Sequence, residues 1–172
     1  MKIIIINGYP ESGKDTFVDF CREECIKHGH YSFHELHTSD PVKDAFRVLG
    51  WNGGTKLPST RKAMADMMEM SNSLYDTSFK YIQRSLIQLG AIDTEFIVFV
   101  HCREAHNIAR YKSVFDATTL LVKIDRPHDL SNDSDRNVEK HIYDSVVFNK
   151  DGLKELREKA IKFISEAITN GK

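Results

Sequence analysis

A glycine-rich segment near the amino terminus carries residue types that bind phosphate. Residues 8–16 read Gly-Tyr-Pro-Glu-Ser-Gly-Lys-Asp-Thr, and they stand between a β-branched run at 2–7 and a helical pattern at 14–28. The backbone N–H groups of such a loop converge on one point, and the start of the helix adds roughly half a positive charge there. The spacing therefore predicts a loop that cradles the phosphates of a nucleoside triphosphate.

The positions of this loop have separate physical roles. Gly8 permits a tight exit from the strand, and Gly13 lets the backbone close on the phosphates. Lys14 reaches the β- and γ-phosphates as a mobile point charge. We expect the nucleotide to bind at Gly8, Glu11, Ser12, Gly13, Lys14, Asp15 and Thr16. The alternative interpretation is a glycine-rich strand-to-helix turn with an exposed lysine.

The last position of the loop departs from the usual Gly-x-x-x-x-Gly-Lys-[Ser/Thr] signature. Asp15 stands there, and Thr16 follows. Thr16 is then the better candidate for the hydroxyl on the Mg²⁺ side. A carboxylate beside bound phosphate is costly, so Asp15 must face away, contact the metal or receive a helix N–H.

The rest of the chain alternates between strand and helix patterns. Strands are predicted at 2–7, 31–37, 95–101, 118–124 and 145–148, and helices at 14–28, 41–49, 60–70, 71–89, 104–112 and 151–170, with Gly90 ending the fourth of these helices. Such alternation favours right-handed βαβ units and a parallel sheet. The helical stretch between Pro41 and Gly90 is too long for one crossover, which indicates a subdomain.

Composition limits the classes of partner. The 172 residues contain 24 basic and 25 acidic side chains, a net charge of −1, so no global field attracts nucleic acid or an anionic membrane. The longest apolar run, Ile3–Ile6, is too short for a transmembrane helix, and the first residues do not resemble a signal peptide. The cysteines, Cys21, Cys25 and Cys102, are odd in number and favour buried thiols in a cytoplasmic protein.

The run Gly13-Lys14-Asp15-Thr16 resembles the deoxynucleoside monophosphate kinases of bacteriophages and their bacterial relatives. Further stretches of the chain carry the same resemblance: Thr38-Ser-Asp-Pro-Val-Lys43-Asp-Ala-Phe with Leu49-Gly-Trp51, Phe99-Val-His101-Cys-Arg103-Glu104, Ser131 to Glu139, and Tyr143 to Asn149. The matches extend over most of the chain. The phosphate-loop match is specific for nucleotide binding, and the others are moderately specific.

The resemblance implies an α/β fold of the P-loop NTPase class, with three α/β/α layers around a five-stranded parallel sheet. It implies one domain over 1–172, with a helical acceptor-binding subdomain at about 40–90 and a lid at about 126–140. The implied reaction transfers the γ-phosphoryl group of ATP, with Mg²⁺, to a nucleoside 5′-monophosphate. The implied partners are small nucleotides, and the sequence leaves a homodimer open. Many P-loop kinases carry an aspartate where His101 stands, so Mg²⁺ binding at that strand end is in doubt.

Phosphoryl transfer also requires cations that neutralise the phosphates. Arg103 follows a buried strand at its carboxyl end, where α/β proteins bind ligands. It is our main candidate, with an ion pair to Glu104 or Glu95 as the alternative. Arg136 and Arg126 border the polar lid, where they are otherwise solvated loop charges.

The subdomain supplies the remaining substrate candidates. Arg61 and Lys43 are expected to contact the acceptor phosphate, although helix-surface charges explain them equally well. Ser39 and Asp40 are candidates for acceptor contact or for capping the helix at 41–49, and Glu104 joins them beside Arg103. Trp51 and Tyr75 are interpreted as core or hinge packing, with stacking on a base as the alternative. Met64, Met67, Met68 and Met70 are interpreted as core filling, and His37 and His101 as buried, satisfied histidines.

Two other functions remain open at this stage. One is a kinase of another phosphorylated small molecule, of the dephospho-coenzyme A or phosphomevalonate type. The other is a nucleotide-binding regulatory protein without transfer activity, which the histidine at position 101 favours. The base preference of a nucleotide acceptor cannot be read from these residues.

Overall fold

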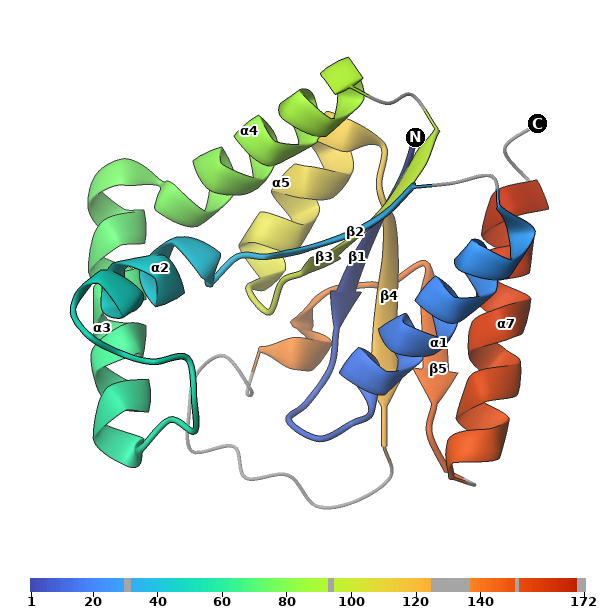
Figure 1. The fold of residues 1–172 in the computed structure, drawn as a ribbon, viewed down its shortest axis with the longest axis horizontal. Helices are drawn as coiled ribbons and strands as arrows, with labels where there is room; N and C mark the ends of the chain where they lie inside the picture. The colour runs from blue at the N-terminus through green and yellow to red at the C-terminus, as the bar shows by residue number, and fades with distance from the viewer. Residues whose placement is uncertain (30–31, 93–94, 125–136, 151, 170–172) are drawn as a thin grey trace. The chain divides into compact units, whose positions relative to one another are not determined.

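The computed structural model describes residues 1–29, 32–92, 95–124, 137–150 and 152–169. Five strands form one sheet in the order β2-β3-β1-β4-β5 (Figure 1). The strands are β1 (Lys2–Asn7), β2 (Ser32–His37), β3 (Phe96–His101), β4 (Thr118–Lys123) and β5 (Ser145–Phe148). β1 pairs in parallel with both β3 and β4, and β4 pairs in parallel with β5. This architecture confirms the predicted five-stranded α/β fold.

The chain divides into two compact units, residues 1–35 with 93–172, and residues 36–92. The first unit contains α1 (Lys14–His28), α5 (Ala105–Phe115), α7 (Leu153–Thr169) and the short 3₁₀ helix η1 (Val138–Lys140). The second contains α2 (Asp40–Val48), α3 (Pro58–Tyr75) and α4 (Thr77–Ile92). Within the described residues, no helix combines the length and apolar character needed to cross a membrane.

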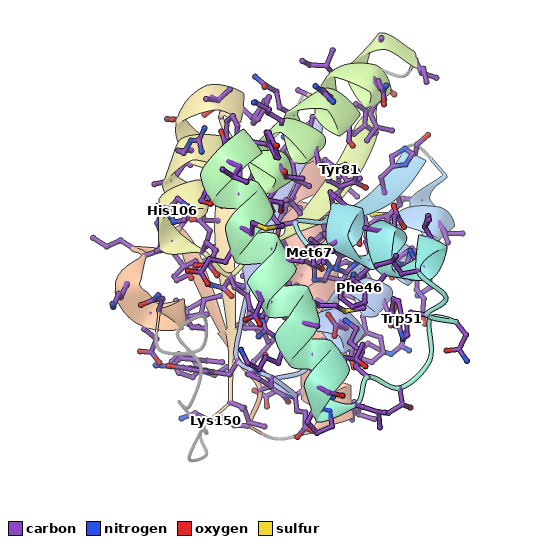
Figure 2. The ribbon with its side chains drawn as sticks, turned by 90° about the vertical axis from the view of Figure 1, so that its left-hand side faces the viewer. Phe46, Trp51, Met67, Tyr81, His106 and Lys150 are labelled. Carbon is purple, nitrogen blue, oxygen red and sulfur yellow. The ribbon has the colours of Figure 1, made fainter. Side chains whose placement is uncertain are left out.

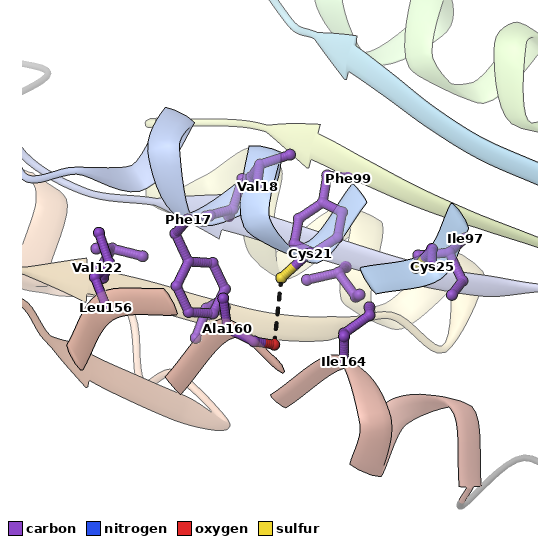
Figure 3. Close-up of a cluster of buried hydrophobic side chains, with 13 residues drawn as sticks. Phe17, Val18, Cys21, Cys25, Ile97, Phe99, Val122, Leu156, Ala160 and Ile164 are labelled. Carbon is purple, nitrogen blue, oxygen red and sulfur yellow. Dashed lines mark hydrogen bonds between the residues drawn. The ribbon is translucent and has the colours of Figure 1, made fainter. Parts of the chain in front are cut away.

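The core of the first unit lies between the sheet and the pair α1 and α7 (Figure 3). Every residue of β3 is buried, because a central parallel strand is covered on both faces. Phe17 and Cys21 of α1 meet Ala160 and Ile164 of α7, and the Cys21 thiol donates a hydrogen bond to the Ala160 carbonyl at 3.6 Å. α5 packs against β1 and β4.

The prediction of buried thiols is confirmed. Cys21, Cys25 and Cys102 are buried and form no disulfide. Burial raises the pKa of Cys21, with a smaller contribution from Cys25, and burial raises the pKa of Cys25 to about 11. These thiols therefore stay protonated and act as small apolar side chains.

The helices of the second unit differ from the sequence prediction in their boundaries. The break that was predicted before Ser71 lies at Asp76, whose backbone is left-handed with φ 53°. The Asn72 side chain fixes this break, because its Oδ1 accepts the N–H of Ser78 at 2.8 Å. α4 then continues through Gly90 to Ile92, so the predicted stop at Gly90 is wrong. A single glycine costs a helix only about 1 kcal/mol relative to alanine, which is too little to end the helix by itself.

Side-chain burial in this unit corrects two further expectations. Met64 is buried and fills the core, but Met70 is 55% exposed. Tyr75 is 66% exposed, so it takes no part in core packing. A helix with one buried stripe leaves its other faces in solvent, and the spacing of the methionines places them on more than one face.

Asp144 joins three elements of the first unit just before β5. Its Oδ2 accepts hydrogen bonds from the N–H and the hydroxyl of Thr119 in β4, at 2.8 and 2.7 Å. Its Oδ1 pairs with Lys112 of α5. Burial pushes the pKa of Asp144 up, but the bonds from Lys112 and Thr119 outweigh it and hold the pKa below the ordinary carboxyl value.

We predict that Asp144→Ala destabilises the protein by about 1–3 kcal/mol, because it leaves the buried Thr119 groups without their acceptor. The lowered pKa means that this contribution is present above the ordinary carboxyl pKa and is lost as the pH falls through the lowered value. Urea unfolding followed by circular dichroism at neutral and acid pH measures both effects. Glu158→Ala, at an exposed position of α7, is the control, with an expected change within about 0.5 kcal/mol. An equal loss at every pH would contradict the charge-based explanation.

Candidate phosphate-binding site

The glycine-rich loop turns into α1 through a left-handed residue. Gly13 has φ 89° and ψ 11° and stands at the N-cap position of the helix. Its carbonyl accepts the first helical hydrogen bond, from the Phe17 N–H at 2.8 Å. An added Cβ at Gly13 would lie 2.6 Å from Asn149 Nδ2, so both the backbone conformation and the available space require glycine. The first N–H groups of α1, which no preceding helical turn can bind, therefore lie at this end of the loop.

Gly8 is needed for a different reason. It follows β1 directly, and an added Cβ would lie 2.6 Å from the backbone oxygen of Val122 in β4. This neighbour is backbone and cannot move aside as the end of a side chain would. The sequence interpretation of Gly8 as a turn residue therefore missed its close packing against the next strand.

Asn7, the last residue of β1, connects the loop to two other segments. Its side chain is buried, and its Oδ1 accepts the N–H of Gly8 at 2.8 Å. Its Nδ2 donates to the Arg103 carbonyl at 3.3 Å and to the Tyr143 hydroxyl at 2.7 Å. One amide therefore links the start of the loop, the end of the β3 segment and the approach to β5.

The Tyr143 hydroxyl links the Asn7 amide to η1. It donates to the Val138 carbonyl at 2.6 Å, and Val138 is buried with Tyr9 and Leu121. Burial raises the pKa of Tyr143 to about 12, against a lowering by the hydrogen bond from Asn7. Val138 falls within the range of the predicted polar lid. Its buried side chain anchors this end of the range. The remainder of the lid, with Arg126 and Arg136, lies outside the described residues.

Asn149 and Glu139 hold the loop from its other side. Asn149 Nδ2 donates to the Ser12 carbonyl at 3.1 Å, and its own N–H donates to the Lys123 carbonyl at 2.7 Å. The Tyr9 hydroxyl donates to Glu139 Oε1 at 3.0 Å, and Lys123 Nζ lies 2.8 Å from the same oxygen. Sequence reasoning did not select Asn7 or Asn149 as site residues, although an asparagine at the carboxyl end of a strand is a usable signal.

Charged groups gather where α1 begins. Lys14 Nζ lies 3.6 Å from Asp15 Oδ2, with the Asp15 side chain 73% exposed. The other carboxylate oxygen of Asp15 lies 3.5 Å from Nδ1 of His101, which is 7% exposed at the end of β3. The predicted phosphate ligand and the predicted Mg²⁺-side residues Asp15 and Thr16 therefore stand on one helical turn, beside a buried histidine.

Arg103 and Glu104 follow β3 directly, as predicted from the sequence. The Glu104 carbonyl accepts the first hydrogen bond of α5, from Ile108 N–H at 3.0 Å, and Glu104 is the N-cap residue of that helix. Cys102 between them and the strand is buried, and burial raises its pKa to about 12. The connection from β3 to α5 is thus held by hydrogen bonds to the backbone carbonyls of Arg103 and Glu104.

The second unit contains the remaining candidates. Asp40 is the first residue of α2 and not its cap, which corrects the sequence interpretation, and Ser39 is the N-cap residue without a side-chain capping bond. Asp40 accepts the His37 N–H and the Lys43 ammonium, both at 2.9 Å. These bonds hold the pKa of Asp40 below its ordinary value, although burial acts in the opposite direction and is the largest single influence.

Arg61 and Trp51 lie elsewhere in this unit. Arg61 is exposed near the start of α3, and its Nε donates to the Lys56 carbonyl at 3.2 Å. Trp51 follows α2 and packs near Phe46, whose carbonyl accepts its N–H at 2.9 Å (Figure 2). The cations of Arg47 and Lys56 lie 5.6 and 5.4 Å from the Trp51 ring centre. The structure therefore brings Asp40 and Lys43 together and gives Trp51 cationic neighbours.

No protein-family profile matches the sequence, and no curated protein matches it either. Solved structures of kinases do resemble the fold. A sugar kinase from Janibacter sp. has a TM-score of 0.53 at 10% identity, with 96% of this chain and 95% of that chain covered. The shikimate kinase of Aquifex aeolicus has a TM-score of 0.51 at 13% identity, with 99% of each chain covered. The APS kinase of Mycobacterium tuberculosis has a TM-score of 0.50 at 12% identity, covering 95% of this chain and 96% of that one. The chain therefore has the fold of the P-loop kinases.

Proposed function

We propose that this protein is an ATP-dependent kinase that transfers a γ-phosphoryl group to a nucleoside or deoxynucleoside 5′-monophosphate. The observation that carries the proposal is the loop of residues 8–16, which leaves β1, turns through left-handed Gly13 and presents the start of α1 with Lys14 beside it. Such a loop offers backbone N–H groups and one cation to a polyphosphate, and this is the arrangement that phosphoryl transfer uses.

In the proposed reaction an oxygen of the acceptor phosphate forms a bond to the γ-phosphorus of ATP while the bond to the bridging oxygen of ADP breaks. The loop N–H groups and Lys14 neutralise charge on the phosphate oxygens as this happens. Asp15 and Thr16 fit a Mg²⁺ ion by the chemistry of their donors, since Mg²⁺ prefers oxygen ligands. When bound with ATP, this ion would supply positive charge that neutralises the phosphate oxygens.

The choice of a nucleotide acceptor rests on the sequence at 38–46 and 99–104 together with the helical unit at 36–92. In this unit Ser39, Asp40, Lys43 and Arg61 are the proposed acceptor contacts. Lys43 and Asp40 are held together at 2.9 Å, which gives the start of α2 a fixed pair of a cation and an acceptor oxygen. Arg103 is proposed to bind the acceptor phosphate from the end of β3, with Glu104 beside the acceptor.

A panel of acceptors tests this assignment. ADP release from ATP is measured with each nucleoside and deoxynucleoside monophosphate, with dephospho-coenzyme A and phosphomevalonate, and with shikimate, adenylyl sulfate and sugars, the substrate classes that the names of the similar kinases give. Turnover with a monophosphate nucleotide supports the proposal. Turnover only with another acceptor reassigns the substrate, and nucleotide binding without any turnover supports the regulatory alternative.

We predict that Lys14→Ala lowers the turnover number by at least about a hundredfold, because loss of one well-placed charge at a transition state has effects of that order. The melting temperature should change by only a few degrees. Lys162→Ala removes a lysine whose side chain is 78% exposed on α7 and serves as the control. Turnover of the Lys14 variant within about tenfold of wild type would contradict the assigned role.

We predict that Arg103→Lys lowers kcat/KM by about tenfold or more while thermal stability changes little. Lysine keeps the charge but loses the bidentate fork, and a hydrogen bond to a charged group is worth roughly 1.5–3 kcal/mol. Steady-state kinetics and thermal unfolding are measured on the same variant. Near-normal kinetics with a clear fall in melting temperature would instead identify Arg103 as part of a structural ion pair.

A further inference from the structure

His101 occupies a position that fixes its ring in the first unit. It is the last residue of β3 and pairs with Ile6 of β1, which stands two residues before Gly8. Its side chain is 7% exposed. The next residue, Cys102, is held to β1 as well, because its N–H donates to the Ile6 carbonyl at 3.1 Å. The imidazole therefore projects from the end of a rigid central strand, next to the start of the phosphate loop.

Both nitrogens of this ring face carboxylates. Nδ1 lies 3.5 Å from Asp15 Oδ1, and Nε2 lies 3.4 Å from Glu35 Oε2. Glu35 is held in turn by an ion pair with Arg22 of α1. Arg22 also donates to Asp19 at 2.6 Å and lies 5.3 Å from the ring centre of Phe33. The Nε2 side of the ring thus lies beside Glu35, which Arg22 holds, and Nδ1 is turned toward Asp15.

Relative to the general arrangement of P-loop enzymes, the carboxylate has exchanged its place at the strand end, where His101 stands, for a place on the loop, at Asp15. There the loop hydroxyl after the lysine and an aspartate at a strand end hold the Mg²⁺ ion. Here the carboxylate is on the loop, at Asp15, and the strand end carries an imidazole. An imidazole nitrogen is a poor ligand for Mg²⁺, whereas a carboxylate oxygen suits it. Because Asp15 lies within 3.5 Å of His101, the negative charge stands close to the strand end although it comes from the helix.

We propose that this exchange is compensated: Asp15 supplies the carboxylate oxygen for nucleotide-bound Mg²⁺, and His101 is a positioning residue that holds Asp15 in place. Glu35 and Arg22 support His101 from behind. The inference rests on the proposed nucleotide-binding function and deepens it, by assigning a role to a buried histidine that the transfer chemistry does not otherwise use. An exposed carboxylate with a rotatable side chain gains most from such a partner, since outer-shell contacts orient metal ligands.

The test measures how strongly Mg²⁺ increases the affinity for a nucleotide that cannot react. The dissociation constant of the ATP analogue AMP-PNP is determined calorimetrically with Mg²⁺ and with EDTA, and the ratio of the two values is the readout. We predict that Asp15→Asn lowers this ratio by about tenfold or more and that His101→Ala lowers it by about tenfold, the range known for outer-shell partners. His106→Ala, at an exposed histidine of α5, should leave the ratio unchanged.

The double variant separates positioning from a structural role. If His101 acts through Asp15, the double variant with Asp15→Asn and His101→Ala should show the same ratio of dissociation constants as Asp15→Asn alone. Additive losses would overturn the positioning role. Asp15 is 73% exposed, so Asp15→Asn should fold normally, and a ratio within about twofold of wild type in this variant overturns the proposal by itself.

The reverse exchange provides a gain of function. Asp15→Ser combined with His101→Asp returns the carboxylate to β3, and we expect this pair to bind with a higher ratio than Asp15→Ser alone. Electron paramagnetic resonance of Mn²⁺ with AMP-PNP reports the same differences directly at the metal. Mg²⁺-dependent binding by the wild type without transfer to any acceptor would refute the kinase proposal and leave this inference standing. A wild type that binds no nucleotide would refute both.

Discussion

The left-handed turn at Gly13 is the constraint on which the site depends. Its φ of 89° ends the loop and starts α1 in one step, which sets the direction in which the first N–H groups of the helix point. A side chain at this position would be strained by the backbone and would collide with Asn149. The position of Lys14 follows from the same turn, since it is the first residue of the helix.

Two amide side chains from outside the loop hold the loop around this turn. Asn7 binds Gly8, the Arg103 carbonyl and Tyr143, and Asn149 binds the Ser12 carbonyl. A buried amide with all of its bonds made is stabilising, and one that loses a partner is costly. The two asparagines therefore couple the loop to β3, β4 and the approach to β5, so a phosphate bound there would meet a preorganised site.

Ionisable side chains around the start of α1 form a chain of neighbours. Lys14 lies beside Asp15, Asp15 lies beside His101, and His101 and Arg22 lie beside Glu35. A carboxylate next to bound phosphate is unfavourable unless a cation or metal accompanies it. Lys14 lies close to Asp15, and the proposed Mg²⁺ ion would meet the same need once Lys14 binds phosphate.

The amino-acid sequence by itself determined the strands, the order of elements and the phosphate loop. A β-branched run such as Ile3–Ile6 favours a buried strand, and the spacing of Gly8, Gly13 and Lys14 is local. Helix ends in the second unit were harder to place, because the break at Asp76 depends on a side-chain bond from Asn72 and not on a glycine.

Only the tertiary structure decided which residues surround the loop. Asn7 and Asn149 are separated by most of the chain, and His101 meets Asp15 and Glu35 from three different elements. Such contacts arise because parallel strands bring their carboxyl ends to one edge of a sheet, whatever their distance in sequence. The local pattern shows that Asp15 departs from the common signature. The order in which the strands pair determines that His101 is its neighbour.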